Sequence, residues 1–286
     1  MRWVCVLGLL LVLLHLSTSL LLGAFNIQTF GDKKSSNPAH MKIICTIVCH
    51  YDIILIQEVR DPEQEVIKRL MTAVNNQCPQ YNFISSGYLG PGSHTERYLY
   101  LFRVPMVSVG NFYIYDDPQG LYKRFSRPPF IVEFSSTQTA VGKFVLIPQH
   151  TSPSDAVLQI NALYDVVTGV ITNFNTTNIV LLGDFNAGGD YVSSPRWNWI
   201  RLSKDPWFHW LITNDQETTV PRKGKKGHPY DRIVVTDDMM KGVVPGSAKV
   251  YNFMLDFGLT EEQATEISDH YPVEVELKKN RKRVHE

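Results

Sequence analysis

The chain has 286 residues, 44% of them hydrophobic and 20% charged, and its 28 Lys and Arg residues balance its 28 Asp and Glu residues. This composition excludes a disordered chain, a collagen and a disulfide-dense mini-protein. Because the formal net charge is zero, any chemistry on phosphate must come from local groups rather than from a global field. The length allows two domains or one large domain with a sizeable core.

The N-terminus has the pattern of a secretory signal peptide over residues 1–19. An apolar run from Trp3 to Leu14 follows a positively charged start, and the small residues Ser17 to Ser19 suit signal cleavage. A membrane anchor is the alternative, but the run is short for a membrane span because His15 interrupts it. We therefore predict secretion through the endoplasmic reticulum and no stable membrane anchor. The glycosylation sequon at Asn175 agrees with that route.

Removal of the signal would leave three cysteines, Cys45, Cys49 and Cys78, which cannot all pair within one chain. Cys45 and Cys49 are four residues apart on a predicted helix, where nearly parallel Cα–Cβ directions make a bridge awkward. We therefore predict that these residues are small apolar fillers and that they form no zinc site.

The first half of the chain alternates apolar strands with amphipathic helices. A buried strand over Leu20 to Ile27 precedes a helix that ends near Cys49, and Asp52 to Gln57 is a second apolar strand. The next helix is predicted to start with Asp61 as its N-cap and Gln64 in a capping box. Further strands are predicted over Asn82 to Ser85, Arg97 to Phe102, Val107 to Tyr115, Phe130 to Phe134 and Lys143 to Ile147.

The second half repeats this pattern, and no Gly/Ser-rich linker or composition break divides the chain. A long helix follows Ser152-Pro153-Ser154. The expected strands are Ile179 to Leu182, Trp207 to Ile212, Arg232 to Thr236 and Pro272 to Leu277. The economical architecture is one domain with two packed sheets and helices outside them.

Eight polar residues lie at the ends of predicted strands. One such residue alone would usually be a turn or a cap. A strand that ends in an acid or amide also fixes that group while the following loop lets a ligand reach it. As a set, they predict a site for a hard cation with oxygen ligands. The residues are Asn26, Glu58, His150, Asp184, Asn186, Asp231, Asp269 and His270.

Two histidines in this set, His150 and His270, have carboxylates available to orient them. Either histidine alone would more often be structural. With Glu96 and Asp231 as orienting groups, the two suit a general base and a general acid that work near neutral pH. His209 lies between two aromatic residues and is predicted to be a packed side chain.

Five blocks of sequence around these residues resemble the deoxyribonuclease I family. They are Leu55-Ile56-Gln57-Glu58-Val59-Arg60-Asp61, His150 with Pro153 to Val157, Gly183 to Ala187, Tyr230 to Val235, and Ser268 to Val275. The resemblance spans Gly23 to Leu277. It implies a four-layer α/β/β/α sandwich of two mixed sheets flanked by helices, over residues 20–278, with a basic tail at 279–286. It also implies a secreted, metal-dependent endodeoxyribonuclease that leaves 5′-phosphate ends.

The resemblance assigns three kinds of role, with Mg²⁺ or Mn²⁺ as the implied cation. Metal and phosphate ligands fall on Asn26, Glu58, Asp184, Asn186 and Asp269. The catalytic set falls on His150 with Glu96 and on His270 with Asp231. The DNA contacts fall on Arg60, Arg127 and Tyr230. One histidine would take a proton from water and the other would protonate the 3′-oxygen, in an order that the sequence leaves open.

Several positions depart from the family pattern. His94 replaces a tyrosine, and Pro91 replaces an arginine that enters the minor groove, which predicts weaker or redirected duplex binding. The disulfide next to the site is absent, since its positions fall on the Gly188-Gly189 region and His228, and the small-loop disulfide is missing around Pro118 to Arg124.

The Ca²⁺ sites that the resemblance implies are incomplete. Asp117 and Glu217 match acidic ligands, but Lys123 and Pro128 occupy other positions of the first site. Inhibition by actin is left open, because the apolar patch implied for it is changed. The changed positions are Phe83, Ser85 and Phe130.

The segment Arg222-Lys223-Gly224-Lys225-Lys226 is an insertion relative to the family, just before the block that contains Asp231. It is either a solvated loop or an arm that binds phosphates, and the basic tail from Lys278 to Arg283 has the same two interpretations.

The sequence therefore predicts a monomeric, secreted deoxyribonuclease with double-stranded DNA as its substrate. One alternative is a phosphodiesterase of the same superfamily that acts on lipid or inositol phosphates. The other is a nucleic-acid- or actin-binding relative with weakened catalysis. A pure binder would not need two orienting carboxylates beside two histidines, which argues against the last interpretation.

Overall fold

The computed structural model describes residues 19–117 and 123–280. Most of the predicted signal peptide, the end of the basic tail and part of the segment around Pro118 to Arg124 lie outside these residues. Within them, no helix is both long and apolar enough to cross a membrane.

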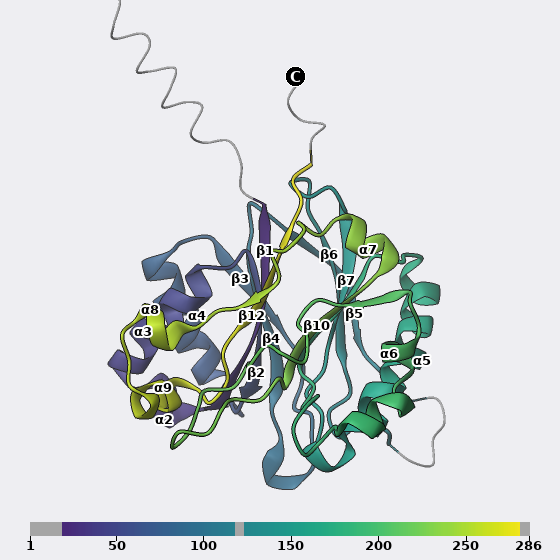
Figure 1. Ribbon diagram of the computed structural model, residues 1–286. Helices are drawn as coiled ribbons and strands as arrows, with labels where there is room; N and C mark the ends of the chain where they lie inside the picture. The colour runs from purple at the N-terminus through teal and green to yellow at the C-terminus, as the bar shows by residue number, and fades with distance from the viewer. Residues whose placement is uncertain (1–18, 118–122, 281–286) are drawn as a thin grey trace, which may run out of the picture.

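Two six-stranded mixed sheets pack face to face at the centre of the molecule (Figure 1). The first has the order β11 (Lys249–Val250), β12 (Val273–Leu277), β1 (Leu20–Phe30), β2 (Ile53–Val59), β4 (Arg97–Arg103), β3 (Tyr81–Ser85). The second has the order β5 (Ser108–Ile114), β6 (Phe130–Ser135), β7 (Lys143–Pro148), β8 (Ile179–Asp184), β10 (Asp231–Thr236), β9 (Phe208–Trp210). The pairs β1–β2 and β7–β8 are parallel, and the other pairs are antiparallel.

Helices cover the outer face of each sheet. The first sheet carries α2 (Asp32–Ser35), α3 (Pro38–Cys49), α4 (Glu65–Gln77), α8 (Phe253–Asp256) and α9 (Glu261–Ile267). The second carries α5 (Ala156–Phe174) and α6 (Arg201–Lys204), and α7 (Asp237–Lys241) follows β10. Three short 3₁₀ helices are η1 (Gly92–His94), η2 (Pro153–Asp155) and η3 (Ser194–Trp199).

Three apolar clusters hold these layers together. One lies between the two sheets, and each of the others lies between a sheet and its helices. Strands β1, β2 and β8 are therefore buried on both faces, which is why they are nearly continuous apolar runs. The predicted four-layer α/β/β/α sandwich is confirmed.

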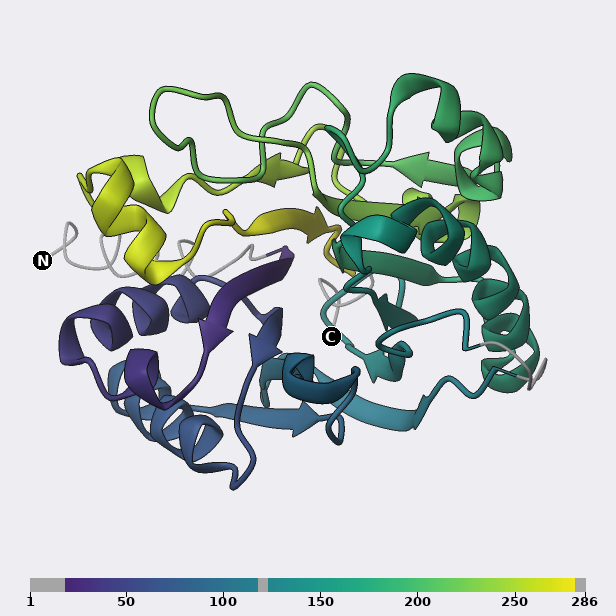
Figure 2. The same ribbon diagram turned by 90° about the horizontal axis from the view of Figure 1, so that it is seen from below.

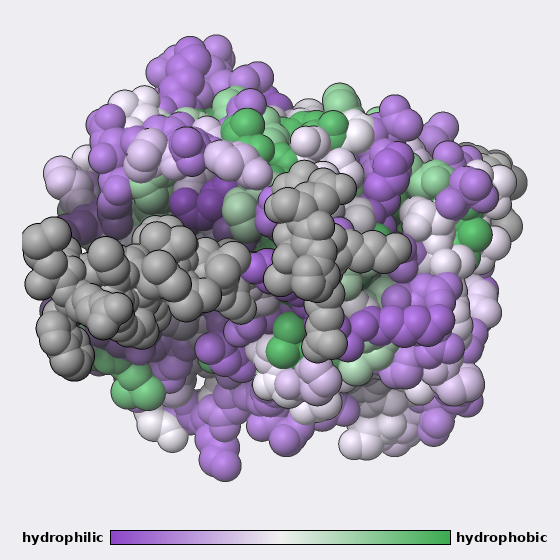
Figure 3. Space-filling view, turned by 90° about the horizontal axis from the view of Figure 1, so that it is seen from above, coloured by the Kyte–Doolittle hydropathy of each residue, from purple (hydrophilic) through white to green (hydrophobic). Residues whose placement is uncertain are grey.

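The carboxyl ends of β1, β2 and β8 meet at one end of the sandwich, which faces the viewer in Figure 2. Gln57 joins the two sheets there, because its Nε2 donates to Gln149 O (2.8 Å) and its Oε1 accepts from Asp184 N (2.9 Å). A Cβ on Gly183 would lie 2.6 Å from Gln149 O and from Gln57 Nε2. The close approach of the two sheets at this point therefore requires glycine. On the opposite end, hydrophilic side chains surround small hydrophobic patches (Figure 3).

The predicted start of α4 is wrong. The helix begins at Glu65, after Gln64 in the left-handed region (φ 60°). Asp61 is not its N-cap, but its buried Oδ2 accepts a hydrogen bond from Ile67 N (2.8 Å). The carboxylate thus binds a first-turn amide from outside the helix, which satisfies an otherwise unpaired donor.

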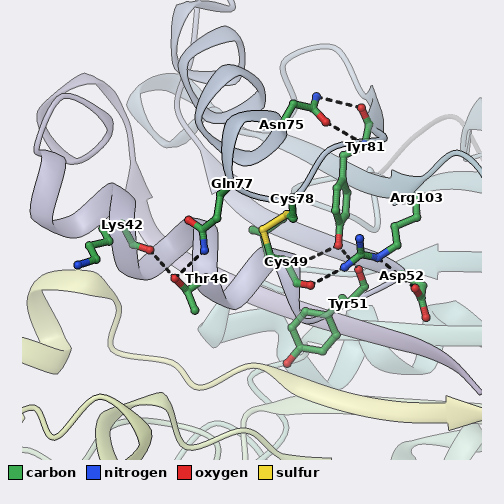
Figure 4. The surroundings of a disulfide bond; sticks show 11 residues. Lys42, Thr46, Cys49, Tyr51, Asp52, Asn75, Gln77, Cys78, Tyr81 and Arg103 are labelled. Atoms are coloured by element: carbon green, nitrogen blue, oxygen red, sulfur yellow. Dashed lines mark hydrogen bonds and ion pairs between the residues drawn. A yellow bond between two sulfur atoms is a disulfide. The ribbon is translucent and has the colours of Figure 1, made fainter. Parts of the chain in front are cut away.

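The prediction that all three cysteines are apolar fillers is wrong for two of them. Cys49 and Cys78 form a disulfide with a Cα–Cα distance of 6.0 Å, which joins the C-terminal ends of α3 and α4 (Figure 4). Among the cysteines of residues 19–117 and 123–280, Cys45 is the one free thiol, and it is buried. The two bridged cysteines come together because both helices pack on the same face of the first sheet.

Candidate active site

The predicted ligands and catalytic residues come together at the end of the sandwich where β1, β2 and β8 finish. Asn26 lies in β1, Glu58 in β2, Asp184 at the end of β8 and Asp231 at the start of β10. His150 is the second residue after the end of β7. Glu96 lies just before β4, and Asp269 and His270 precede β12.

The first histidine pair is buried. Nδ1 of His150 lies 2.6 Å from Oε1 of Glu96, and the two residues are 7% and 1% exposed. The phenol of Tyr98 accepts a hydrogen bond from the backbone N–H of His150 (2.8 Å). Burial lowers the pKa of His150, but the charge and hydrogen bond of Glu96 outweigh it and raise the pKa above its ordinary value.

The second pair has the same geometry. Nδ1 of His270 lies 2.7 Å from Oδ2 of Asp231, and Thr218 Oγ1 donates to the same carboxylate oxygen (2.7 Å). Burial lowers the pKa of His270, but the negative charges of Asp231 and Asp184 hold it well above its ordinary value. In both pairs the carboxylate occupies Nδ1, so Nε2 is the nitrogen that faces the site.

Asp184 lies between the two histidines. Its Oδ2 is 3.5 Å from Nε2 of His150 and 3.6 Å from Nε2 of His270. Burial raises the pKa of Asp184 above its ordinary value, although the charge of His270 opposes that rise. Ligand atoms of Asp184, Asp231 and His270 lie within 4.8 Å of one another, a spacing that a metal ion could bridge.

Oxygen atoms suited to a hard cation surround this centre. Nδ2 of Asn26 donates to Glu58 Oε1 and to Asp184 Oδ2, both at 3.2 Å. Oδ1 of Asn26 and Oδ1 of Asp269 are buried without a hydrogen-bond partner in the part of the chain that the structure describes. Because an unpaired buried acceptor is costly, these atoms fit ligands of a divalent cation.

Glu58 is held in an unusual backbone conformation, with φ 59°. Its Oε2 accepts a hydrogen bond from Thr29 N (2.8 Å), across irregular register between β1 and β2. Burial raises the pKa of Glu58, but the charge of His150 and hydrogen bonds from Thr29 and Asn26 outweigh it, so the pKa lies below its ordinary value. The Glu58 carboxylate is therefore anionic at neutral pH.

The side chain of Asn186 forms a hydrogen bond with a backbone carbonyl group rather than with another of the predicted ligands. Its Nδ2 donates to Thr151 O (3.1 Å), its backbone N–H donates to Asp184 Oδ1 (2.9 Å), and its φ is 47°. The residue thus fixes the carboxylate of Asp184 through the main chain.

The three predicted DNA-contacting residues differ in exposure. Arg60 is 36% exposed, with Nη2 3.5 Å from Glu58 Oε2. Arg127 is buried, and its Nε lies 2.9 Å from Glu96 Oε2, so it neutralises the carboxylate that orients His150. Tyr230 is half-buried and stacks on His228, with 5.0 Å between ring centroids.

Several residues form contacts around the site that no local sequence pattern predicts. Gln28 Nε2 donates to Asp269 Oδ2 (2.9 Å), and Ser268 Oγ donates to Asn26 O (2.6 Å). Lys34 Nζ donates to Gln28 O (2.5 Å) and to Ile267 O (2.6 Å). Polarity within an apolar strand could have marked Gln57, but the other contacts depend on tertiary structure alone.

One prediction outside the site is wrong. His209 is not packed in the core: its side chain is 37% exposed and pairs with Asp237 at 2.5 Å. Asp117, which matches an acidic ligand of the incomplete first calcium site, binds the guanidinium of Arg124 through both carboxylate oxygens (2.7 and 3.0 Å). Arg124 also lines a cavity of about 420 Å³ between β5 and α5, away from the histidines.

Comparisons with known proteins show the family to which the chain belongs. The model of the Endonuclease/Exonuclease/phosphatase family matches residues 23–270. The chain is 44% identical to Deoxyribonuclease-1 of Sus scrofa, over 98% of this chain and 100% of the relative, and 43% identical to Deoxyribonuclease-1 of Homo sapiens, over 97% and 100%. It is 44% identical to Deoxyribonuclease-1-like 2 of Mus musculus, over 92% and 93%.

Two solved structures from bacteria have the same fold. One is an endonuclease/exonuclease/phosphatase from Bacteroides vulgatus, with a TM-score of 0.61 and 16% identity over 92% of this chain and 100% of that chain. The other is a mannosyl-6-phosphatase from Bacteroides thetaiotaomicron, with a TM-score of 0.59 and 16% identity over 91% and 99%. At this identity the likeness concerns the fold alone.

Proposed function

The chain belongs to the deoxyribonuclease I family within the endonuclease/exonuclease/phosphatase superfamily and is a deoxyribonuclease. We propose that it is a secreted, metal-dependent endonuclease with histidine acid–base catalysis. The observation that carries the catalytic proposal is the position of Asp184 between two histidine–carboxylate pairs, 3.5 Å and 3.6 Å from their Nε2 atoms.

Hydrolysis of a DNA phosphodiester makes three demands. An anionic phosphate repels hydroxide, so the enzyme must activate water, compensate charge on the phosphoryl oxygens and protonate the 3′-oxygen that leaves. Glu96 and Asp231 hold Nδ1 of His150 and His270, which aims each Nε2 into the site. One histidine then accepts the proton of the water, and the other donates to the leaving oxygen.

A bound Mg²⁺ or Mn²⁺ would supply charge stabilisation at the phosphoryl oxygens. The residues that would hold it are Asn26, Glu58, Asp184, Asn186 and Asp269. In the described part of the chain, Oδ1 of Asn26 and Oδ1 of Asp269 lack a hydrogen-bond partner, and this observation and the anionic state of Glu58 support this choice. Ca²⁺ is not proposed at Asp117, because Arg124 already neutralises that carboxylate.

Two features of the molecule support secretion. The disulfide between Cys49 and Cys78 is typical of an oxidising compartment. Asn175 is exposed at the C-terminal end of α5, where a glycan could be attached without displacing packed side chains. We propose that residues 1–19 are removed as a signal peptide and that one catalytic domain spans residues 20–278.

A plasmid-nicking assay tests the activity. Purified protein with Mg²⁺ is expected to convert supercoiled plasmid to nicked and linear forms, and chelation by EDTA should stop the reaction. Phosphatase treatment followed by end-labelling should show 5′-phosphate ends. Intact plasmid beside efficient hydrolysis of inositol phosphates or lipid headgroups would instead favour the alternative phosphodiesterase. Tight binding of DNA without cleavage would favour a binding protein.

A further inference from the structure

The inserted basic segment, here called the basic arm (Arg222 to Lys226), follows residues that form backbone hydrogen bonds with the segment before β12, which carries two site residues. Val220 N donates to Asp269 O (2.8 Å), and Tyr271 N donates to Thr218 O (2.7 Å). Thr219 also forms an antiparallel bridge with His270. The start of the arm is therefore fixed to the backbone on both sides of the catalytic histidine.

The tip of the arm is a formed turn. Arg222 N donates to Lys225 O (3.3 Å), and Lys225 N donates to Arg222 O (2.9 Å). The two residues between them, Lys223 and Gly224, have φ values of 51° and 70°. Positive φ at both central positions is typical of a tight two-residue hairpin turn. In Figures 1 and 2 the segment between β9 and β10 extends toward the side of the molecule that carries α8 and α9.

Arg222 is the cation of the arm that reaches the site. Its Nη2 lies 3.1 Å from Oδ2 of Asp269, and its side chain is 54% exposed. Lys223, Lys225 and Lys226 are exposed, and across residues 19–117 and 123–280 their side chains form no ion pair or hydrogen bond. The four cations of the arm are therefore not equivalent.

We propose that Arg222 binds a phosphate of the DNA strand next to the bond that is cleaved. A guanidinium has five N–H donors in a planar fork, so one amino group can hold Asp269 while the remaining donors bind phosphate oxygens. Gln28 holds the same oxygen of Asp269 from the other side (2.9 Å), which fixes the position of the pair. This inference rests on the proposed nuclease function. It identifies the substrate as a polymer with several phosphodiesters rather than a molecule with a single phosphodiester.

The test compares Arg222→Gln with Lys223→Gln, which removes one charge from the adjacent residue of the same arm. We expect Arg222→Gln to raise KM for a duplex oligonucleotide about tenfold while kcat changes less than about threefold, because it removes binding of a remote phosphate. Lys223→Gln should change KM less than about threefold. Because Arg222 also contacts Asp269, hydrolysis of bis(p-nitrophenyl) phosphate, which has no neighbouring phosphate, should change less than about threefold in both variants.

Binding measured without hydrolysis separates this inference from the proposed function. In EDTA, fluorescence anisotropy with the same duplex should show weaker binding for Arg222→Gln, and the slope of log affinity against log salt should decrease by about 0.9 for one lost phosphate contact. Unchanged binding, equal effects of the two variants, or an equal loss on bis(p-nitrophenyl) phosphate would overturn the role of Arg222. Arg222-dependent binding by a wild-type protein that cleaves no DNA would overturn the proposed function but support the contact.

Discussion

Nδ1 of His150 lies 2.6 Å from Oε1 of Glu96 in a contact where both side chains are almost fully buried. The carboxylate holds the ring in one orientation and favours its charged form. Since His270 and Asp231 have the same relationship at 2.7 Å, each histidine is oriented independently of the other.

Replacement of either catalytic histidine should abolish most of the activity. We expect His150→Ala and His270→Ala each to lower the rate of plasmid nicking by at least about two orders of magnitude, as for a lost general acid or base. His209→Ala is the matched control, because His209 also pairs with a carboxylate, Asp237, but lies outside the site. Thermal melting should show that all three variants fold. Near wild-type nicking in either site variant would remove that histidine from the mechanism.

Neutralisation of Glu58 should weaken metal binding. Because an amide is a poorer ligand for a hard cation than a carboxylate, we expect Glu58→Gln to need roughly tenfold more Mg²⁺ for half-maximal activity. Glu65→Gln serves as the control, since Glu65 is exposed and pairs with Lys68 on the surface of α4. An identical Mg²⁺ titration for wild type and Glu58→Gln would place the cation elsewhere.

Lys34 should make stability depend on pH in the alkaline range. Burial lowers the pKa of Lys34 to about 8, against 10.5 for the free side chain. Between these two values the unfolded chain binds more protons than the folded chain, so the free energy of unfolding should rise with pH from about 8 to about 10.5. One pKa unit corresponds to about 1.4 kcal/mol, which limits the rise to about 3.5 kcal/mol.

Urea unfolding of wild type and Lys34→Met at several pH values checks this expectation. The difference in unfolding free energy between the two proteins should shift in favour of wild type as pH rises from about 8 to 10.5. The comparison cancels the titration of groups that both proteins share. A difference independent of pH would mean that Lys34 titrates normally.

The disulfide should contribute to stability but not to catalysis. Cys49 and Cys78 are 29 residues apart, and closing a loop of that length restricts the unfolded chain by about 3.5 kcal/mol. The double variant Cys49→Ser/Cys78→Ser should therefore lose about that much unfolding free energy while its nicking rate at 25 °C stays within about twofold. Reducing agent should lower the Tm of wild type and leave the Tm of the double variant unchanged. A wild-type Tm insensitive to reduction would show that the bond is not formed in solution.

Local pattern was enough for most strands and for the residues at their ends. Apolar runs such as Ile179 to Leu182 predict buried strands because burial on both faces selects continuous apolar residues. Asp184 and Asn186 lie two and four residues after that run, so their place at a strand end is a property of neighbouring residues. The alternation of such strands with amphipathic helices also predicted the two-sheet sandwich, which the structure confirms.

Contacts between segments that are distant in the sequence could not be predicted from local pattern. Cys49 and Cys78 approach each other only because α3 and α4 pack on one sheet. Their pairing is set by the packing of whole elements, about which a short stretch of sequence contains no information.

The residues of the site could be predicted from the sequence, but several contacts between them could not. The acids, amides and histidines were recognisable as a set, and the resemblance to a family paired each histidine with its carboxylate. The contact of Arg222 with Asp269, 47 residues away, and that of Lys34 with Ile267, 233 residues away, arise only in the folded chain. Such contacts depend on loop closure and side-chain direction in three dimensions, and both are decided by tertiary packing rather than by local propensity.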